Sequence, residues 1–215
     1  MTLRVAALYD IHGNLPALEA VLAPAEGADL VVVGGDVVGG AFPAETLERL
    51  RGLGDRARWL RGNAERELLE QPGRAGLSDE QVGFLDGLPE HVELDVDGLG
   101  HVLFCHATPQ NDVDMVTPLT PEARLARILA DVRADAVVAG HTHMQDDRRV
   151  GPVRWVNAGS VGMPYEDEPG AYWALLGPEV ELRRTEYDAT ALGGYEYPQA
   201  SRREAAEYFE GLVRD

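Results

Sequence analysis

The chain has 215 residues, a length that suits one domain with a full hydrophobic core. Its 37 acidic and 19 basic residues give a formal net charge of −18, so the overall field repels a nucleic-acid backbone, and we expect no nucleic-acid partner. No stretch approaches the ~18 apolar residues that a membrane span needs, and the single cysteine, Cys105, leaves no disulfide framework. We therefore expect one domain over residues 1–215, located in the cytoplasm without membrane contact.

The first half of the chain alternates between strand and helix patterns. Short runs of apolar, often β-branched residues predict strands, and longer amphipathic segments predict helices. In chain order these are strand 3–9, helix 15–23, strand 30–33, helix 44–53, strand 58–60, helix 64–69 and a helix after Ser78. Alternation of this kind indicates right-handed crossovers and a largely parallel sheet.

The second half has more hairpin signals, such as Asp97-Gly98 and Gly151-Pro152, and is expected to be more antiparallel. Its predicted elements are strands 92–96 and 102–105, helix 121–131, strands 136–139, 148–150, 153–156, 172–176 and 180–185, and helix 201–213. Two mixed β-sheets packed face to face with helices outside satisfy both halves. The sequence therefore predicts an α/β fold, a four-layer α/β/β/α sandwich, with the last helix on an outer face.

Polar side chains follow five of the apolar runs, at the point where each run ends. They are Asp10 and His12 after the first strand, Asp36 after the second, Asn63 after the third, His106 after residues 102–105, and His141 and His143 after residues 136–139. Taken singly, most of these residues also suit turns or helix caps. The carboxyl ends of strands in open α/β sheets nevertheless gather ligand-binding side chains at one edge, so we expect the seven to lie together.

Imidazole, carboxylate and amide oxygen together suit borderline divalent metals. Seven ligands exceed the needs of one tetrahedral ion, but they serve two ions that share a carboxylate. We therefore expect two divalent transition-metal ions, with Mn as the first choice and Fe, Ni, Co or Zn as alternatives.

These motifs resemble a known family. Asp10-x-His12, Gly35-Asp36, Gly62-Asn63, His106 and Gly140-His141-x-His143 fall in the order of the calcineurin-like metallophosphoesterases. From Val5 to about Gly162 the chain is most similar to the small bacterial single-domain phosphodiesterases of that family. The resemblance implies a two-sheet sandwich flanked by helices, in agreement with the fold expected from the residues.

The resemblance also implies roles for individual residues. Asp10, His12 and His143 would hold one metal, Asn63, His106 and His141 the other, and Asp36 would bridge them. Catalytic roles are expected for Asp36, Asn63, His106 and Asn14. The segment Asn157-Ala158-Gly159-Ser160 looks like a family segment that lies beside the site and supports its ligands.

Two departures from the family pattern bear on the reaction. Ala64 stands where many members carry a His that protonates the leaving oxygen, and no Arg follows Asp36 closely to grip phosphate, although Arg61 is a candidate substitute. Loop 107–120, with Asp112 and Asp114, is expected to cover the site and to repel polyphosphates.

The expected function is that of a dinuclear metal-dependent phosphodiesterase. It would hydrolyse small phosphodiesters by in-line attack of a metal-bridging hydroxide. The alternatives are a phosphomonoesterase or protein phosphatase, a dinucleoside polyphosphate hydrolase, and a catalytically weak binding protein on the same fold.

Overall fold

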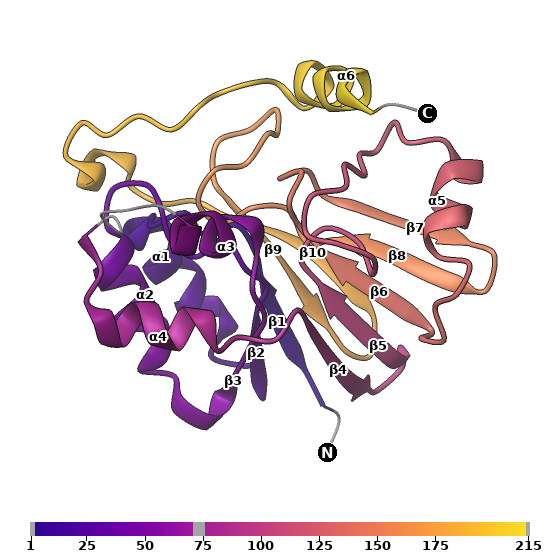
Figure 1. Cartoon of the computed structure of the whole chain (residues 1–215), viewed down its shortest axis with the longest axis horizontal. Coiled ribbons are helices and arrows are strands. Elements are labelled where there is room, and N and C mark those ends of the chain that lie inside the picture. The colour runs from indigo at the N-terminus through magenta and orange to yellow at the C-terminus, as the bar shows by residue number, and fades with distance from the viewer. Residues whose placement is uncertain (1–2, 71–75, 214–215) are drawn as a thin grey trace.

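Two five-stranded sheets form the centre of the molecule (Figure 1). The computed structural model describes residues 3–70 and 76–213. Sheet A has the strand order β10-β9-β1-β2-β3, and sheet B has the order β4-β5-β6-β8-β7. The strands of sheet A are β1 (Val5–Leu8), β2 (Leu30–Val33), β3 (Ala57–Trp59), β9 (Ala171–Leu176) and β10 (Val180–Thr185). Those of sheet B are β4 (His91–Val96), β5 (Gly100–Cys105), β6 (Ala136–Ala139), β7 (Asp146–Val150) and β8 (Val153–Asn157).

Six α-helices are described beside the two sheets. They are α1 (Leu15–Ala25), α2 (Pro43–Arg51), α3 (Asn63–Glu70), α4 (Asp79–Asp86), α5 (Glu122–Ile128) and α6 (Arg202–Leu212), with short 3-10 helices at Gly54–Arg56 and Ala189–Leu192. Helices α1 to α4 lie on the side of sheet A, and α5 lies beyond sheet B (Figure 1). This arrangement confirms the predicted sandwich of two sheets flanked by helices.

Both sheets are mixed, as the change in hairpin signals along the chain predicted. In sheet A, β1 pairs in parallel with β2 and β2 with β3, whereas β9 and β10 are antiparallel. In sheet B, β5, β6 and β8 are parallel, and the antiparallel strands β4 and β7 form the edges. The parallel strands of both sheets thus deliver their carboxyl ends to a shared edge of the sandwich.

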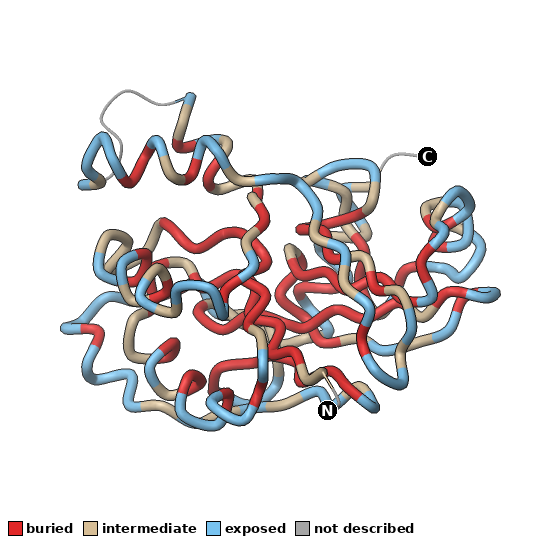
Figure 2. The backbone as a smooth tube through the Cα atoms, turned by 90° about the horizontal axis from the view of Figure 1, so that it is seen from below, coloured by how far each residue is buried: buried red, intermediate tan, exposed pale blue. Residues whose placement is uncertain are grey.

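Side chains on the two faces of the central strands pack into two different hydrophobic cores. Along β1, Ala6 and Leu8 pack with the helices of sheet A, while Val5 and Ala7 pack between the sheets. Successive side chains of a strand point to opposite faces, so a strand buried on both sides is apolar throughout. The same continuous burial runs through the middle of Figure 2, where the central strands are buried along their length.

The expectation for the last helix is wrong. Helix α6 does not pack on an outer sheet face, because the segment after β10 crosses the carboxyl edge of the sandwich and sets α6 above it (Figure 1). Ala205 and Ala206 of α6 pack on Met144, with Tyr165 and Phe209 beside them. Helical periodicity identified an apolar face but not the surface that this face covers.

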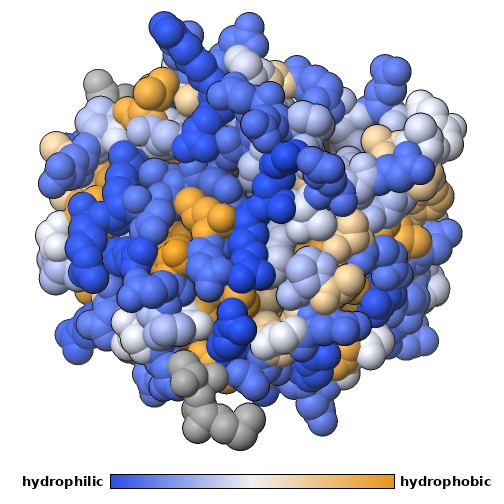
Figure 3. Space-filling view, turned by 180° about the vertical axis from the view of Figure 1, so that it is seen from behind, coloured by the Kyte–Doolittle hydropathy of each residue, from blue (hydrophilic) through white to orange (hydrophobic). Residues whose placement is uncertain are grey.

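The hydrophilic character of the surface agrees with the high net charge. The face opposite to that of Figure 1 is mainly hydrophilic, with small separate apolar patches (Figure 3). Among the described residues, no helix has both the length and the apolar character required to cross a bilayer.

Candidate metal centre

The seven predicted ligand residues occupy the loops at the shared carboxyl edge of the two sheets. Asp10 and His12 follow β1, Asp36 follows β2, Asn63 begins α3 after β3, His106 follows β5, and His141 and His143 follow β6. Strands from both sheets therefore contribute, so the site lies across the junction of the sandwich.

Five of these residues adopt a backbone conformation that is rare for residues other than glycine. Among the described residues, they are the full set of non-glycine residues with positive φ: Asp10 (52°), His12 (47°), Asp36 (50°), His141 (67°) and His143 (60°). Each such conformation costs on the order of 1–3 kcal/mol and persists where the surrounding structure holds it. Strain gathered at one set of polar residues is characteristic of a functional site.

Backbone hydrogen bonds between loops hold this strained arrangement. The amide of Asp10 donates to the carbonyl of Gly35 at 3.1 Å, and the amide of His12 donates to the carbonyl of Asp36 at 2.8 Å. The ligand loops after β1 and β2 are therefore tied to each other directly, which fixes the distance between their side chains.

One group of ligand atoms gathers around Asp10, His12 and His143. His143 Nε2 lies 3.2 Å from both Asp10 Oδ1 and His12 Nε2, and His12 Nε2 lies 4.0 Å from Asp10 Oδ1. These atoms are close enough to coordinate a single ion.

A second group gathers around His106. Its Nε2 lies 3.0 Å from Asn63 Oδ1, 3.5 Å from Asp36 Oδ1 and 3.9 Å from Asp10 Oδ1. The other oxygen of Asp36, Oδ2, lies 3.7 Å from His12 Nε2. Asp36 thus presents one oxygen to each group, while Asp10 presents the same oxygen to both.

The hydrogen-bond pattern shows that the converging atoms of the two groups are hydrogen-bond acceptors and that they face other acceptors. His106 donates from Nδ1 to the carbonyl of Gly34 at 2.9 Å, and His143 donates from Nδ1 to the carbonyl of Met163 at 2.6 Å. In the neutral rings, both Nε2 atoms therefore carry lone pairs, and they face carboxylate or amide oxygens. Asp10 Oδ1 and His141 Nε2 are buried without any hydrogen-bond partner. Buried lone pairs that converge in this way are costly unless a cation lies among them, so the residues fit a metal centre.

The pKa values of two histidines suit metal binding. Burial, with His143 nearby, lowers the pKa of His12 to about 3, and burial lowers the pKa of His141 to about 4. Both rings are therefore neutral near pH 7 and can offer a lone pair. Burial opposes the ionisation of Asp10, but the neighbouring His143 outweighs it and holds the Asp10 pKa below its usual range. Burial raises the pKa of Asp36 to about 7, and the carboxylates of Glu65 and Asp10 act in the same direction.

Two glycines in the motifs stand where any larger residue would clash with a carboxylate of the site. A Cβ at Gly62 would collide with Asp36 Oδ1, and a Cβ at Gly140 would collide with Asp10 Oδ2. In each case a glycine lets the backbone of one ligand loop approach the carboxylate of another.

Sequence reasoning missed Glu65, the residue that holds the loop after β2. Its fully buried carboxylate accepts hydrogen bonds from the backbone amides of Asp36, Val37, Val38 and Gly62 at 2.8–3.2 Å. An acidic residue in the first turn of a helix ordinarily interacts with its own helix N-terminus. The available signal was its place two residues after Asn63, directly behind a ligand.

Residues 157–160 have the supporting contacts that were expected. Asn157 donates to the carbonyl of Gly140 at 2.7 Å, and Ser160 Oγ donates to the carbonyl of Asp10 at 2.7 Å. This segment therefore holds two ligand loops by their backbones.

Asn14 has different neighbours from those its predicted catalytic role requires. Its Oδ1 caps α1 by accepting from the amide of Ala17, and its Nδ2 donates to the carbonyl of Gly162 and the hydroxyl of Tyr187. These contacts give Asn14 a structural role, and a catalytic one stays a prediction without a contact to support it.

Loop 107–120 reaches the site but does not present two free carboxylates. Its residues Thr108, Asn111 and Asp112 line a small pocket together with His106. Asp112 is paired with Arg66 Nε at 2.7 Å, and Asp114 accepts from Thr108 Oγ1 at 3.4 Å. Arg66 offsets the charge of Asp112 but not that of Asp114, so the repulsion of polyphosphates by this loop stays a prediction that rests on one carboxylate.

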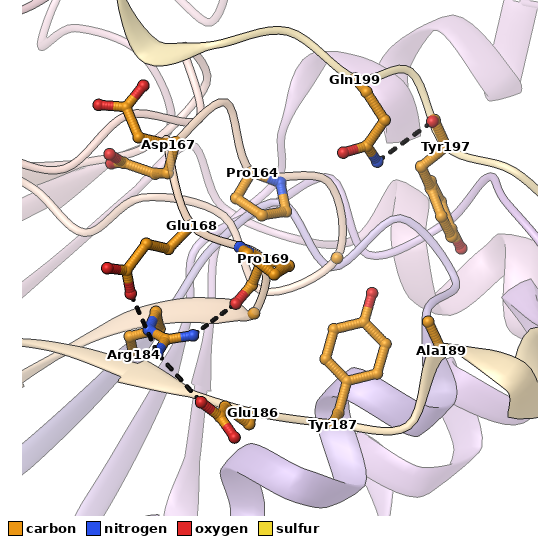
Figure 4. A pocket seen from close by; sticks show the side chains of 13 residues that line it. Pro164, Asp167, Glu168, Pro169, Arg184, Glu186, Tyr187, Ala189, Tyr197 and Gln199 are labelled. Atoms are coloured by element: carbon orange, nitrogen blue, oxygen red, sulfur yellow. Dashed lines mark hydrogen bonds and ion pairs between the residues drawn. The ribbon is translucent and has the colours of Figure 1, made fainter.

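A cavity of about 640 Å³ lies behind the first ligand loop, between residues 162–170 and 184–199 (Figure 4). Tyr187 and Tyr197 face its interior, while Arg184 is tied to Glu168 and Glu186 at one side (Figure 4). Its lining contains none of the seven ligand residues. The cavity is thus a neighbour of the centre and not part of it.

Comparison with known proteins gives a consistent family assignment. Residues 3–177 match the model of the calcineurin-like phosphoesterase superfamily domain. The chain is 27% identical to an uncharacterized protein of Methanocaldococcus jannaschii, over 86% of this chain and 88% of that protein. It is 28% identical to phosphodiesterase YfcE of Escherichia coli strain K12, over 77% of this chain and 83% of that protein. A crystal structure of a hypothetical protein of Pyrococcus horikoshii OT3 shares the fold with a TM-score of 0.78 at 22% identity, covering 89% of this chain and 91% of that one.

Proposed function

Because the chain belongs to the calcineurin-like phosphoesterase superfamily, we propose that it is a phosphodiesterase whose single domain holds two divalent metal ions. The observation that carries the proposal is the position of Asp36, with one oxygen toward His12 and the other toward His106. A carboxylate between two groups of acceptor atoms is the arrangement that a pair of ions requires.

The residues divide the work between them. Asp10, His12 and His143 would hold one ion, Asn63, His106 and His141 the other, and Asp36 both. When bound, such ions neutralise phosphoryl oxygens and lower the pKa of water toward neutrality. The hydrogen bond from His106 Nδ1 to Gly34 and that from Asn63 Nδ2 to Glu67 Oε1, at 3.3 Å, orient the two ligands so that Nε2 and Oδ1 face the centre.

The preference for a diester rests on the relative YfcE, which is named a phosphodiesterase. In this chain Ala64 offers no acid at the start of α3, where its amide donates to Asp36 Oδ1 at 2.7 Å, and this favours an ester with a good leaving group. We expect a small phosphodiester substrate and Mn²⁺ as the metal, with Fe, Ni, Co or Zn as alternatives that elemental analysis of the purified protein distinguishes.

The variant Asp36→Asn tests the two-ion arrangement. It should lower the bound metal from about two ions per chain to one or fewer and reduce phosphodiesterase activity by orders of magnitude, because a neutral amide bridges cations poorly. Asp55→Asn, an exposed residue just before β3, at the end of that strand away from Asn63, is the matched control. Full metal content together with wild-type turnover in Asp36→Asn would refute the arrangement.

The role of Ala64 is tested through the leaving group. General acid catalysis is worth about 10²–10⁴-fold where it operates, so rates of the wild type should fall steeply from nitrophenyl to alkyl diesters. Equal rates on both, with chemistry rate-limiting, would mean that another residue supplies the proton.

A further inference from the structure

A small pocket opens beside His106, on the side of the metal centre that faces loop 107–120. It has a volume of about 150 Å³, and its lining includes Arg61, Arg66, Glu90, Thr108, Asn111 and Asp112 together with His106. At about 30 Å³ for each water in the liquid, this is room for about five waters. The pocket can therefore take one small polar group but not a nucleoside or a peptide.

The two arginines of this pocket differ in how their charge is used. Arg66 makes a two-point contact with Asp112, at 2.7 and 3.3 Å, so its charge is largely offset. Arg61 has one distant ion-pair partner, Glu90 Oε1 at 3.6 Å, and the Glu90 side chain is 76% exposed. Pairs of that kind contribute little, so Arg61 keeps a positive charge that is available to a ligand.

The local charge is notable against the rest of the molecule. The chain carries a formal net charge of −18, whereas this pocket holds two guanidinium groups that balance its two carboxylates, those of Glu90 and Asp112. Guanidinium is well suited to carboxylate and phosphate because its planar donors match two oxygens at once.

We propose that this pocket binds a second anionic group of the substrate, a carboxylate or a phosphate that lies next to the scissile phosphoryl group. The inference rests on the proposed phosphoesterase function, since the scissile group would lie at the metal centre. The shared wall at His106 places the two groups on adjacent atoms of one substrate. The volume favours a whole anionic group over a single phosphoryl oxygen.

The test compares two ligands that differ in one carboxylate. Binding of 2-phosphoglycolate and of ethyl phosphate to the metal-loaded protein is measured by isothermal titration calorimetry. The wild type should bind 2-phosphoglycolate more tightly. Arg61→Gln should weaken the binding of 2-phosphoglycolate by about 10- to 100-fold, the usual contribution of a charged hydrogen bond. It should change the affinity for ethyl phosphate far less. Arg58→Gln, which removes an exposed guanidinium from β3, three residues before Arg61, is the control.

A second variant should change the affinity for 2-phosphoglycolate in the opposite direction. Asp112→Asn removes the partner of Arg66, so 2-phosphoglycolate should bind ~2- to 5-fold more tightly. Thermal melting and metal content of each variant show whether it is folded and loaded, and Arg61→Lys keeps the charge if Arg61→Gln does not fold.

The outcomes separate the possible readings. Equal weakening of both ligands in Arg61→Gln would overturn the proposal, because Arg61 would then grip the scissile phosphoryl group. Equal affinity of the wild type for the two ligands would overturn it as well. Failure of the wild type to hydrolyse any phosphodiester, with the ligand preference intact, would count against the proposed function and not against the anion pocket.

Discussion

Five ligand residues sit in the left-handed region of backbone conformation, where an Asp or His is tolerated only under constraint. Their neighbours supply that constraint through hydrogen bonds, and the carboxylate of Glu65 supplies the most for the Asp36 loop. One side chain accepts from the amides on both sides of the bridging position, at Asp36 and Val37, and also from Gly62. Glu65 therefore sets the geometry of a ligand without touching the centre itself.

Replacing Glu65 with Gln should destabilise the fold and weaken metal binding. The amide keeps the shape of the side chain but loses the charge that serves four backbone donors, and hydrogen bonds to charged groups are worth about 1.5–3 kcal/mol each. We expect the free energy of unfolding to fall by about 2–4 kcal/mol in urea titrations of the metal-free protein.

Metal content should fall in the same variant, because the Asp36 loop loses its support. Glu70→Gln, an exposed residue on the same helix, should leave both measurements at their wild-type values. A Glu65→Gln protein with normal stability and normal metal content would show that the four hydrogen bonds are dispensable.

At the level of single residues, the sequence indicated the candidate ligands better than the residues that support them. Asp10, His12 and His143 could be singled out because a coordinating side chain must be of a particular chemical type. A supporting residue needs only a side chain that can reach the backbone amides of a ligand loop. In the sequence, Glu65 therefore resembled any acidic residue in a first helical turn. Arg61 lay between these cases, since its charge was visible but its weak pairing with Glu90 was not.

The segment after β10 is the element that joins the two halves of the sandwich above the centre. Tyr197 donates its hydroxyl to the carbonyl of His12 at 2.8 Å and accepts from the amide of Ala41 at 3.3 Å. Farther along, Glu210 of α6 accepts from Thr117 and Thr120 and pairs with Arg124. The Tyr165 ring stacks on His143 at 5.3 Å and also contacts Phe209 of α6. The segment thus touches ligand loops of both sheets, beyond the 3–177 range that the family model covers.

The variant Tyr197→Phe tests this connection. It removes two hydrogen bonds to loops that carry or adjoin His12, at about 1 kcal/mol each. For a protein of this size we expect the midpoint of thermal unfolding to fall by about 2–8 °C. Tyr195→Phe changes the same group on an exposed ring beside it and should have little effect. An equal change in both variants would mean that the His12 contact contributes nothing specific.

Most elements could be predicted from the sequence, but the position of the last one could not. The strands near Leu30 and Ala136 are short apolar runs that no other structure accommodates as well. The last helix was recognised from its pattern, yet its partner surface depends on Met144 and Tyr165, which lie far away in the sequence. A pattern within one element contains no information about a partner of that kind.

The whole molecule carries enough negative charge to affect its own stability. Self-repulsion from a formal net charge of −18 opposes the compact state. The screening length falls from about 30 Å at 0.01 M salt to about 8 Å at 0.15 M. We expect the free energy of unfolding to rise between these concentrations of NaCl, measured by urea titration.

Sucrose at matched osmolality serves as the control for effects unrelated to charge. A stability that stays constant or falls as NaCl rises would show that local ion pairs, which salt weakens, outweigh the general repulsion.

For the molecule as a whole, the sequence predicted two sheets and helical layers but not the order of the strands. The mixed pairing in sheet A places β9 beside β1, and no local signal near Ala171 or Val5 specifies that neighbour. The residues of β9 are buried throughout, which fits any central strand.

The position of β1 in the sheet has a consequence for when the site can assemble during synthesis. Strand β1 is synthesised more than 160 residues before its antiparallel neighbour β9. All seven candidate ligands have been synthesised by His143, yet the strand that carries Asp10 still lacks one flank at that time. Pairings between segments so distant in the chain form late and slowly. The nascent chain therefore exposes its candidate ligands before it can arrange them, and we expect the site to assemble only after β9 has been made.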